Sequence, residues 1–115
     1  MMVNEQILFL LDVTRLIERA FESGFLATGG ELWRPKEMQD LYMKQGKTKT
    51  LKSYHLDRLA IDLNFFKKIE ERFVLVGDKK TLQPLGAYWE SLDQKNRWGG
   101  NFKTILDCPH FERAI

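Results

Sequence analysis

The sequence SYHLDRLAIDLNFF, residues 53–66, contains a strand with an acidic side chain in its interior. From Leu59 onward the side chains divide by alternate positions into two sets, as they do in a β-strand that has one face in the core. The predicted core face carries Leu59, Ile61, Leu63 and Phe65, and the opposite face carries Ala60, Asp62, Asn64 and Phe66. A carboxylate inside such a strand is destabilising unless it is paired, hydrogen-bonded or bound to a metal ion, so Asp62 needs a partner.

Helical spacing predicts two helices ahead of this strand. Apolar residues follow the helical period from Val3 to Phe21, and most of this apolar face is expected to lie in the core. The face comprises Val3, Ile7, Leu10, Leu11, Thr14, Ile17 and Phe21. Pro35 suits the first turn of a second helix that ends at Gly46, with Met38, Leu41 and Tyr42 as its inward stripe. Residues 26–34, between the two helices, are predicted to be a loop or a short strand.

Shorter elements are predicted after the strand. Residues 73–76 form a second strand that a turn at Gly77-Asp78 follows, residues 85–92 form a short helix, and RWGGNF (97–102) forms a loop. Pro109 disfavours helix for Cys108, so DCPHFER (107–113) is expected to be extended. Because no repeat or linker interrupts these elements, we expect one small α+β domain over residues 1–115.

Composition narrows the kinds of protein and of site. The 115 residues are 43% hydrophobic and 30% charged, as in globular domains, and no apolar run approaches the ~20 residues that span a bilayer. The N-terminal apolar stretch carries Glu5 and Asp12 and lacks a basic region, so a cytoplasmic protein without a secretory signal is expected. The net charge of +2 identifies no partner, and we expect a monomer. The single cysteine, Cys108, excludes an internal disulfide and a cysteine-based zinc finger.

A metal site in this chain would therefore use histidine and carboxylate ligands. His55 lies seven residues before Asp62, and a loop followed by a strand can aim both side chains at one point. Zinc accepts imidazole nitrogen and carboxylate oxygen, and the third ligand would be His110, the only other histidine. An ion pair of Asp62 with Arg58 or Arg34 is the alternative on these residues alone.

Two carboxylates near His110 are candidates for a general base. Asp107 lies three residues before His110, and a D-x-x-H arrangement on an extended segment can hold the base beside the ligand. Glu112 competes for the role because residues two apart on a strand share a face. A plain turn aspartate ahead of Pro109 is the alternative for Asp107.

Three separated blocks, SYHLDRLAID, WGGNF and DCPHFE, together resemble the zinc peptidases of the M15 family. The resemblance runs from about Arg34 to Glu112 and implies the small fold of D-alanyl-D-alanine peptidases and hedgehog-type domains, a central antiparallel sheet flanked by helices. Many members have glycine three residues after the first ligand histidine, where this chain has Arg58. A bulky residue there implies a different loop backbone.

The family pattern implies a role for each residue that matches it. His55, Asp62 and His110 match the zinc ligands, and Asp107 matches the catalytic acid/base. The remaining matches are Arg34, which would steady the oxyanion, Ser53 beside the substrate, and Gln39 in the same block as Arg34. Trp98 and Gly99 would shape the substrate groove, although core packing is an equal alternative for Trp98.

The resemblance implies hydrolysis of the stem peptides of bacterial peptidoglycan. We expect a phage or prophage endolysin that cleaves the L-alanyl-D-glutamate bond, made in the cytoplasm and acting at the wall after release. A D-alanyl-D-alanine carboxypeptidase or dipeptidase is the nearer alternative. A non-catalytic binding domain is the other, for instance one that binds nucleic acid through Lys44, Lys47, Lys49 and Lys52. Such a run of lysines is more typical of a solvated loop, and no nucleic-acid partner is expected.

Overall fold

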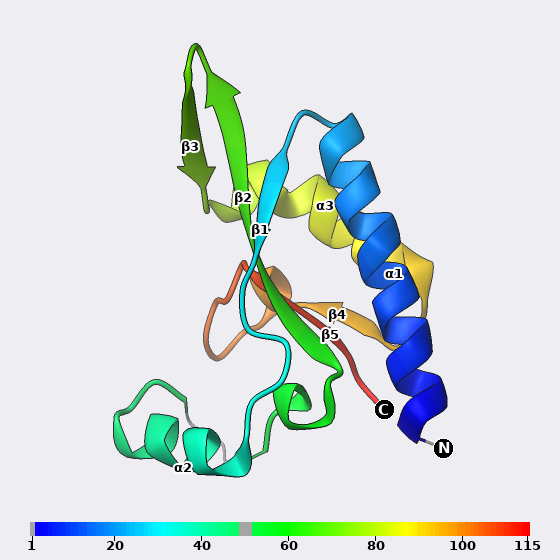
Figure 1. The fold of residues 1–115 in the computed structure, drawn as a ribbon, viewed down its shortest axis with the longest axis vertical. Helices are drawn as coiled ribbons and strands as arrows, with labels where there is room; N and C mark the ends of the chain where they lie inside the picture. Colours follow the sequence, from blue (N-terminus) through cyan, green and yellow to red (C-terminus); the bar gives the residue numbers. More distant parts are fainter. Residues whose placement is uncertain (1, 49–51) are drawn as a thin grey trace.

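A computed structural model describes residues 2–48 and 52–115, so Lys49 of the lysine-rich stretch lies outside the described residues. Within these described residues, three α-helices and five strands form an α+β domain, which confirms the expected fold class (Figure 1). In chain order the elements are α1 Met2–Glu22, β1 Leu26–Gly29, α2 Lys36–Lys44, the 3₁₀ turn η1 Tyr54–Asp57, β2 Ala60–Ile69, β3 Arg72–Val76, α3 Lys79–Leu92, β4 Asn96–Trp98, the 3₁₀ turn η2 Gly99–Asn101 and β5 His110–Arg113.

The strand that the alternating pattern predicts is β2, and it lies at the centre of the sheet. Neighbouring strands are antiparallel in the order β1-β2-β5-β4, and β3 pairs with the outer half of β2. Leu59, Leu63 and Phe65 are buried in the core. In the register of β2 against β5, Asp62 lies directly opposite His110. Strand pairing therefore brings together two candidate ligands that are far apart in the sequence.

Helix α1 packs on the sheet and on α3, but with a different face from the predicted one. Its core contacts come from Phe9, Val13, Leu16 and Ala20, which pack with Trp89 of α3 and the sheet. The predicted core residues Val3, Ile7, Leu10, Leu11, Ile17 and Phe21 are instead 42–69% exposed, and Thr14 is exposed as well. The prediction was wrong because α1 carries two apolar stripes of the same period, and periodicity alone does not say which one is buried.

Three other local predictions need correction. On α2 the buried side chain is Gln39, which accepts a hydrogen bond from Arg34, whereas Met38 and Leu41 are exposed and Tyr42 is half-buried. Helix α3 begins at Lys79, six residues earlier than predicted, since the Asp78 side chain accepts a hydrogen bond from the Thr81 N–H and caps it. The predicted loop 97–102 contributes to β4 and η2. None of the helices among the described residues has the length and hydropathy of a bilayer span.

Candidate metal centre

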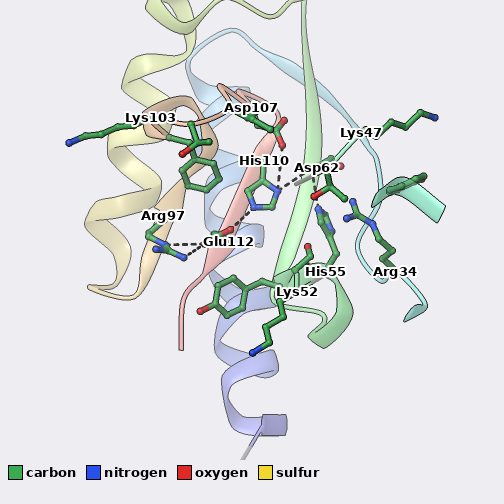
Figure 2. A pocket seen from close by; sticks show the side chains of 17 residues that line it. Arg34, Lys47, Lys52, His55, Asp62, Arg97, Lys103, Asp107, His110 and Glu112 are labelled. Carbon is green, nitrogen blue, oxygen red and sulfur yellow. Dashed lines mark hydrogen bonds and ion pairs between the residues drawn. The ribbon is translucent and has the colours of Figure 1, made fainter. Parts of the chain in front are cut away.

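Three side chains converge at the start of β2, each from a different element (Figure 2). His55 comes from η1, Asp62 from β2 and His110 from β5. Asp62 Oδ1 lies 3.4 Å from His55 Nε2 and 3.6 Å from His110 Nδ1. The three ligand atoms all lie within 4.8 Å of one another, which is a group that can hold a metal ion. The structure thus assembles the three residues that the sequence predicts as ligands.

His55 is held in the orientation that a metal ligand needs. Its ring is 2% exposed, and Nδ1 lies 3.2 Å from the Leu32 carbonyl oxygen. A proton on Nδ1 that bonds this carbonyl leaves the lone pair of Nε2 directed at Asp62. The backbone around the histidine is also fixed, because the Ser53 hydroxyl accepts a hydrogen bond from the His55 N–H at 3.2 Å and caps η1. The Leu32 contact could not be found from the sequence, since it involves a carbonyl of a remote loop.

His110 is oriented by Glu112, which lies behind the ring rather than at the centre. Glu112 Oε1 is 2.6 Å from His110 Nε2, so the Nδ1 side of the ring faces Asp62. Arg97 in turn holds Glu112, with Nε at 2.9 Å and Nη2 at 2.5 Å from Oε2 (Figure 2). Carboxylates of this kind fix ligand histidines in many metal sites. The H-x-E spacing on a strand indicates that Glu112 lies on the same face as His110, but the sequence suggested a general base and not a residue that orients the ring.

The charge balance of the cluster fits a cation. Asp62 Oδ1 is buried and has no hydrogen-bond partner among the described residues, at a point that both histidines face. Burial would raise the pKa of Asp62, but interactions with His110 and His55 outweigh it and lower that pKa. Burial would likewise lower the pKa of His110, whereas Asp62 and Glu112 raise it to about 9. The cluster therefore attracts positive charge, which a divalent cation supplies in place of a proton.

The arginines offered as alternative partners of Asp62 make other contacts. Arg58 stacks over the Trp33 ring, with its guanidinium carbon 4.8 Å from the ring centre. Its φ of 56° and ψ of 37° lie in the left-handed region that glycine favours, so the backbone here is one that a glycine would also adopt. Arg34 donates from Nε to Glu31 and from Nη1 to Gln39, each at 2.6 Å. Gln39 itself is fully buried.

Asp107 lies beside the three ligands and faces the same space. Its Oδ2 is 3.9 Å from His110 Nδ1, and burial raises the pKa of its carboxyl group. A tight turn holds it there: the Asp107 N–H donates to the Gly99 carbonyl and the His110 N–H donates to the Asp107 carbonyl, both at 3.0 Å. A Cβ on Gly99 would lie 2.1 Å from the Asp107 carbonyl oxygen. Only glycine at position 99 allows this turn to close without displacement.

A cavity of about 590 Å³ opens over the cluster. Ser53, Arg34 and Asp107 line it together with the three ligands, whereas Gln39, Trp98 and Gly99 do not. Trp98 is fully buried, and its indole N–H donates to the Cys108 carbonyl, so core packing explains this residue. The cationic side chains of the lining are Arg34, Lys47, Lys52, Arg97 and Lys103 (Figure 2). Lys103 and Arg97 were not predicted, because a lone basic residue in a loop or short strand carries no sequence signal.

Comparisons with known proteins point to one family. A family model described as D-alanyl-D-alanine carboxypeptidase matches residues 46–113, which include all three candidate ligands and Asp107. The crystal structure of the Serratia marcescens L-Ala D-Glu endopeptidase ChiX is similar, with a TM-score of 0.68 and 23% sequence identity over 90% of this chain and 78% of that one. A search of curated proteins finds no match.

Proposed function

Because the chain belongs to the M15 (D-alanyl-D-alanine carboxypeptidase) family of peptidoglycan metallopeptidases, we propose that it is a zinc endopeptidase that cleaves the L-alanyl-D-glutamate bond of stem peptides. The observation that carries this proposal is the convergence of His55, Asp62 and His110 on one point, with Asp107 beside it. Two imidazoles and one carboxylate form a ligand set typical of catalytic zinc, which keeps one position open for water or substrate.

Two side chains around the ligands, Asp107 and Arg34, would transfer the proton and stabilise the oxyanion during hydrolysis. Zinc, when bound, supplies a Lewis acid that acidifies the attacking water and polarises the scissile carbonyl. Asp107 accepts the proton of that water and passes it to the leaving amine, which its position beside His110 and in the cavity lining allows. Arg34 donates to the developing oxyanion. Its bonds to Glu31 and Gln39 fix the guanidinium while N–H donors remain.

Two features favour cleavage of an acidic peptide within the stem over removal of its end. The similar fold of ChiX belongs to an enzyme named for the L-Ala–D-Glu bond. The cationic lining of the cavity, which includes Lys47, Lys52 and Lys103, complements the carboxylates of a glutamate-containing peptide. A D-alanyl-D-alanine carboxypeptidase with the same ligands is the alternative, supported by the description of the matching family. Mass spectrometry of digested wall fragments separates the two by the bond that is cut.

A metal and activity assay on one set of variants tests the proposal. The wild-type protein should bind one zinc ion per chain and clear suspensions of purified cell walls, and a chelator should abolish clearing. Asp107→Asn should keep the zinc and lower clearing by about 10²–10⁴-fold, the usual contribution of a general base. Asp57→Asn is the matched control, because Asp57 is exposed and does not line the cavity. Wild-type activity in Asp107→Asn, or no zinc in the wild type, would overturn the mechanism.

The origin and location of the protein are further parts of the proposal. We propose that it is a phage or prophage endolysin that accumulates in the cytoplasm and reaches the wall after release. Expression in bacteria with and without a pore-forming protein tests this. Lysis should require the pore, and lysis or export without it would contradict the proposal.

A further inference from the structure

Helix α1 presents a second apolar face that the fold does not use. Val3, Ile7, Leu10, Thr14, Ile17 and Phe21 recur at alternating spacings of four and three residues, and we refer to them as the outer stripe. Their apolar members are 42–69% exposed, and Leu11, beside the stripe, is 48% exposed. Helix α1 meets α3, β1 and β5 on its other side and runs along one edge of the molecule (Figure 1). The spacing is that of the contact seam of a coiled coil.

The accessible surface of the chain is larger than that of a typical compact monomer of the same mass. The chain has 7504 Å² of accessible surface, whereas a compact 13.6 kDa monomer has about 6,600 Å². The difference is roughly 900 Å² for the whole chain. A stripe that spans most of a 21-residue helix is long enough for several layers of contact.

From this face we propose that two copies of the chain associate through α1, packed antiparallel along the outer stripe. A two-fold axis near the middle of the helix places Val3 opposite Phe21, Ile7 opposite Ile17 and Leu10 opposite Thr14 of the second copy. Leu11 then faces Leu11 of the second copy close to the axis. The stripe is self-complementary in this direction because its small side chains lie opposite large ones: Thr14 opposite Leu10, and Val3 opposite Phe21.

The charges that flank the stripe select this arrangement. Along the flank, Glu18 and Glu22 are exposed near one end, Asn4 and Leu8 near the other, and Arg15, which pairs with Asp12, lies between them. Parallel helices would place the two acidic ends at the same end of the dimer, but antiparallel helices place Glu18 beside Asn4 of the second copy. The flank also disfavours an anionic lipid surface, which amphipathic helices bind through several lysine and arginine residues, because its single arginine, Arg15, is paired with Asp12 and is outnumbered by Glu18 and Glu22. A second copy of this chain is therefore the favoured occupant, in place of the expected monomer.

The interface would leave the metal centre open. No residue of α1 lines the cavity over His55, Asp62 and His110, so both cavities of a dimer stay accessible. Peptidoglycan presents many stem peptides on one polymer, and two linked sites hold such a substrate longer than one. The proposal concerns assembly and does not depend on which peptide bond is cut.

Sedimentation equilibrium of the full chain over a range of concentrations tests the interface. The wild type should be dimeric, and Ile7→Glu with Leu10→Glu should raise the dimer dissociation constant at least about tenfold, because two buried contacts are lost and charges enter the seam. Both residues are more than half exposed in the single chain, so the variant should keep the far-UV circular dichroism of the wild type. Phe73→Glu is the matched control, since Phe73 is 62% exposed on β3 and should not affect the dimer.

Disulfide crosslinking tests the direction of pairing. Leu11→Cys should form a covalent dimer under mild oxidation, whereas Val3→Cys should not, because only parallel helices bring two copies of residue 3 together. The native Cys108 is buried and serves as background in the wild type. A wild type that is monomeric at all concentrations, a dimer that the two glutamates leave intact, or binding of monomers to phosphatidylglycerol vesicles through Ile7 and Leu10 would each overturn the proposal.

Discussion

At the scale of single residues, Glu112 is the side chain through which the fold orients a metal ligand. Its carboxylate bonds His110 Nε2 at 2.6 Å and is itself 5% exposed. Glu112→Ala should weaken zinc binding by about 10–100-fold, measured by competition with a chromogenic chelator, because the His110 ring loses its fixed orientation. Glu112→Gln keeps an acceptor and should lose less. Glu71→Ala, at an exposed acid in the β2–β3 turn, should bind zinc as the wild type does; equal affinity in all variants would contradict the role.

Arg58, also at the scale of single residues, has a backbone conformation that is unfavourable for a residue with a side chain. A side chain at φ 56° is strained, and the stacking of Arg58 on Trp33 offsets part of the cost. Arg58→Gly should therefore exceed Arg58→Ala in free energy of unfolding by about 1 kcal/mol, measured by urea denaturation. The same pair at Lys80, exposed in α3, should show the opposite order. The same order at both positions would show that the left-handed backbone is not the cause.

At the scale of elements, the turn between η2 and β5 places Asp107 and His110 together. A Cβ at Gly99 would lie 2.1 Å from the Asp107 carbonyl oxygen and 2.9 Å from His110 Cβ, so the turn must move. Gly99→Ala should lower the free energy of unfolding by about 1–3 kcal/mol and lower activity as well, because both site residues shift. Gly77→Ala is the control, since no atom lies within 4 Å of the added Cβ there. Equal stability and activity of the two variants would contradict this account.

At the scale of the whole molecule, the candidate metal ligands are easier to identify from the sequence than the packing of the helices is. Asp62 was identifiable because a carboxylate breaks the apolar pattern of β2, and His55 and His110 because the chain has no other histidine. Their partners, the Leu32 carbonyl and Glu112, depend on how distant segments pair.

The packing of a helix is hard to predict where two of its faces have the same apolar period. Helix α1 has one apolar stripe that includes Leu16 and lies in the core, and the outer stripe, which includes Ile7. Both have the same period, and only the tertiary fold determines which of them is buried. On α2, Gln39 is buried because Arg34 needs an acceptor, a demand that hydrophobic periodicity does not report.

The core and the metal centre are separate parts of this molecule, and their separation predicts the effect of metal removal. Phe9, Leu16, Trp89 and Phe111 pack without any of the three ligands, so a chelator should leave the far-UV circular dichroism unchanged. Zinc at 100 times its dissociation constant should add about 2.7 kcal/mol to the free energy of unfolding. The thermal midpoint should then rise by roughly 10 °C, since each kcal/mol shifts the midpoint of a domain of this size by about 4 °C. Asp62→Asn should remove most of the rise while it keeps the fold, because the amide lacks the charge that binds the cation. If the chelator unfolds the wild type, the metal is part of the core energetics and the two parts are not separate.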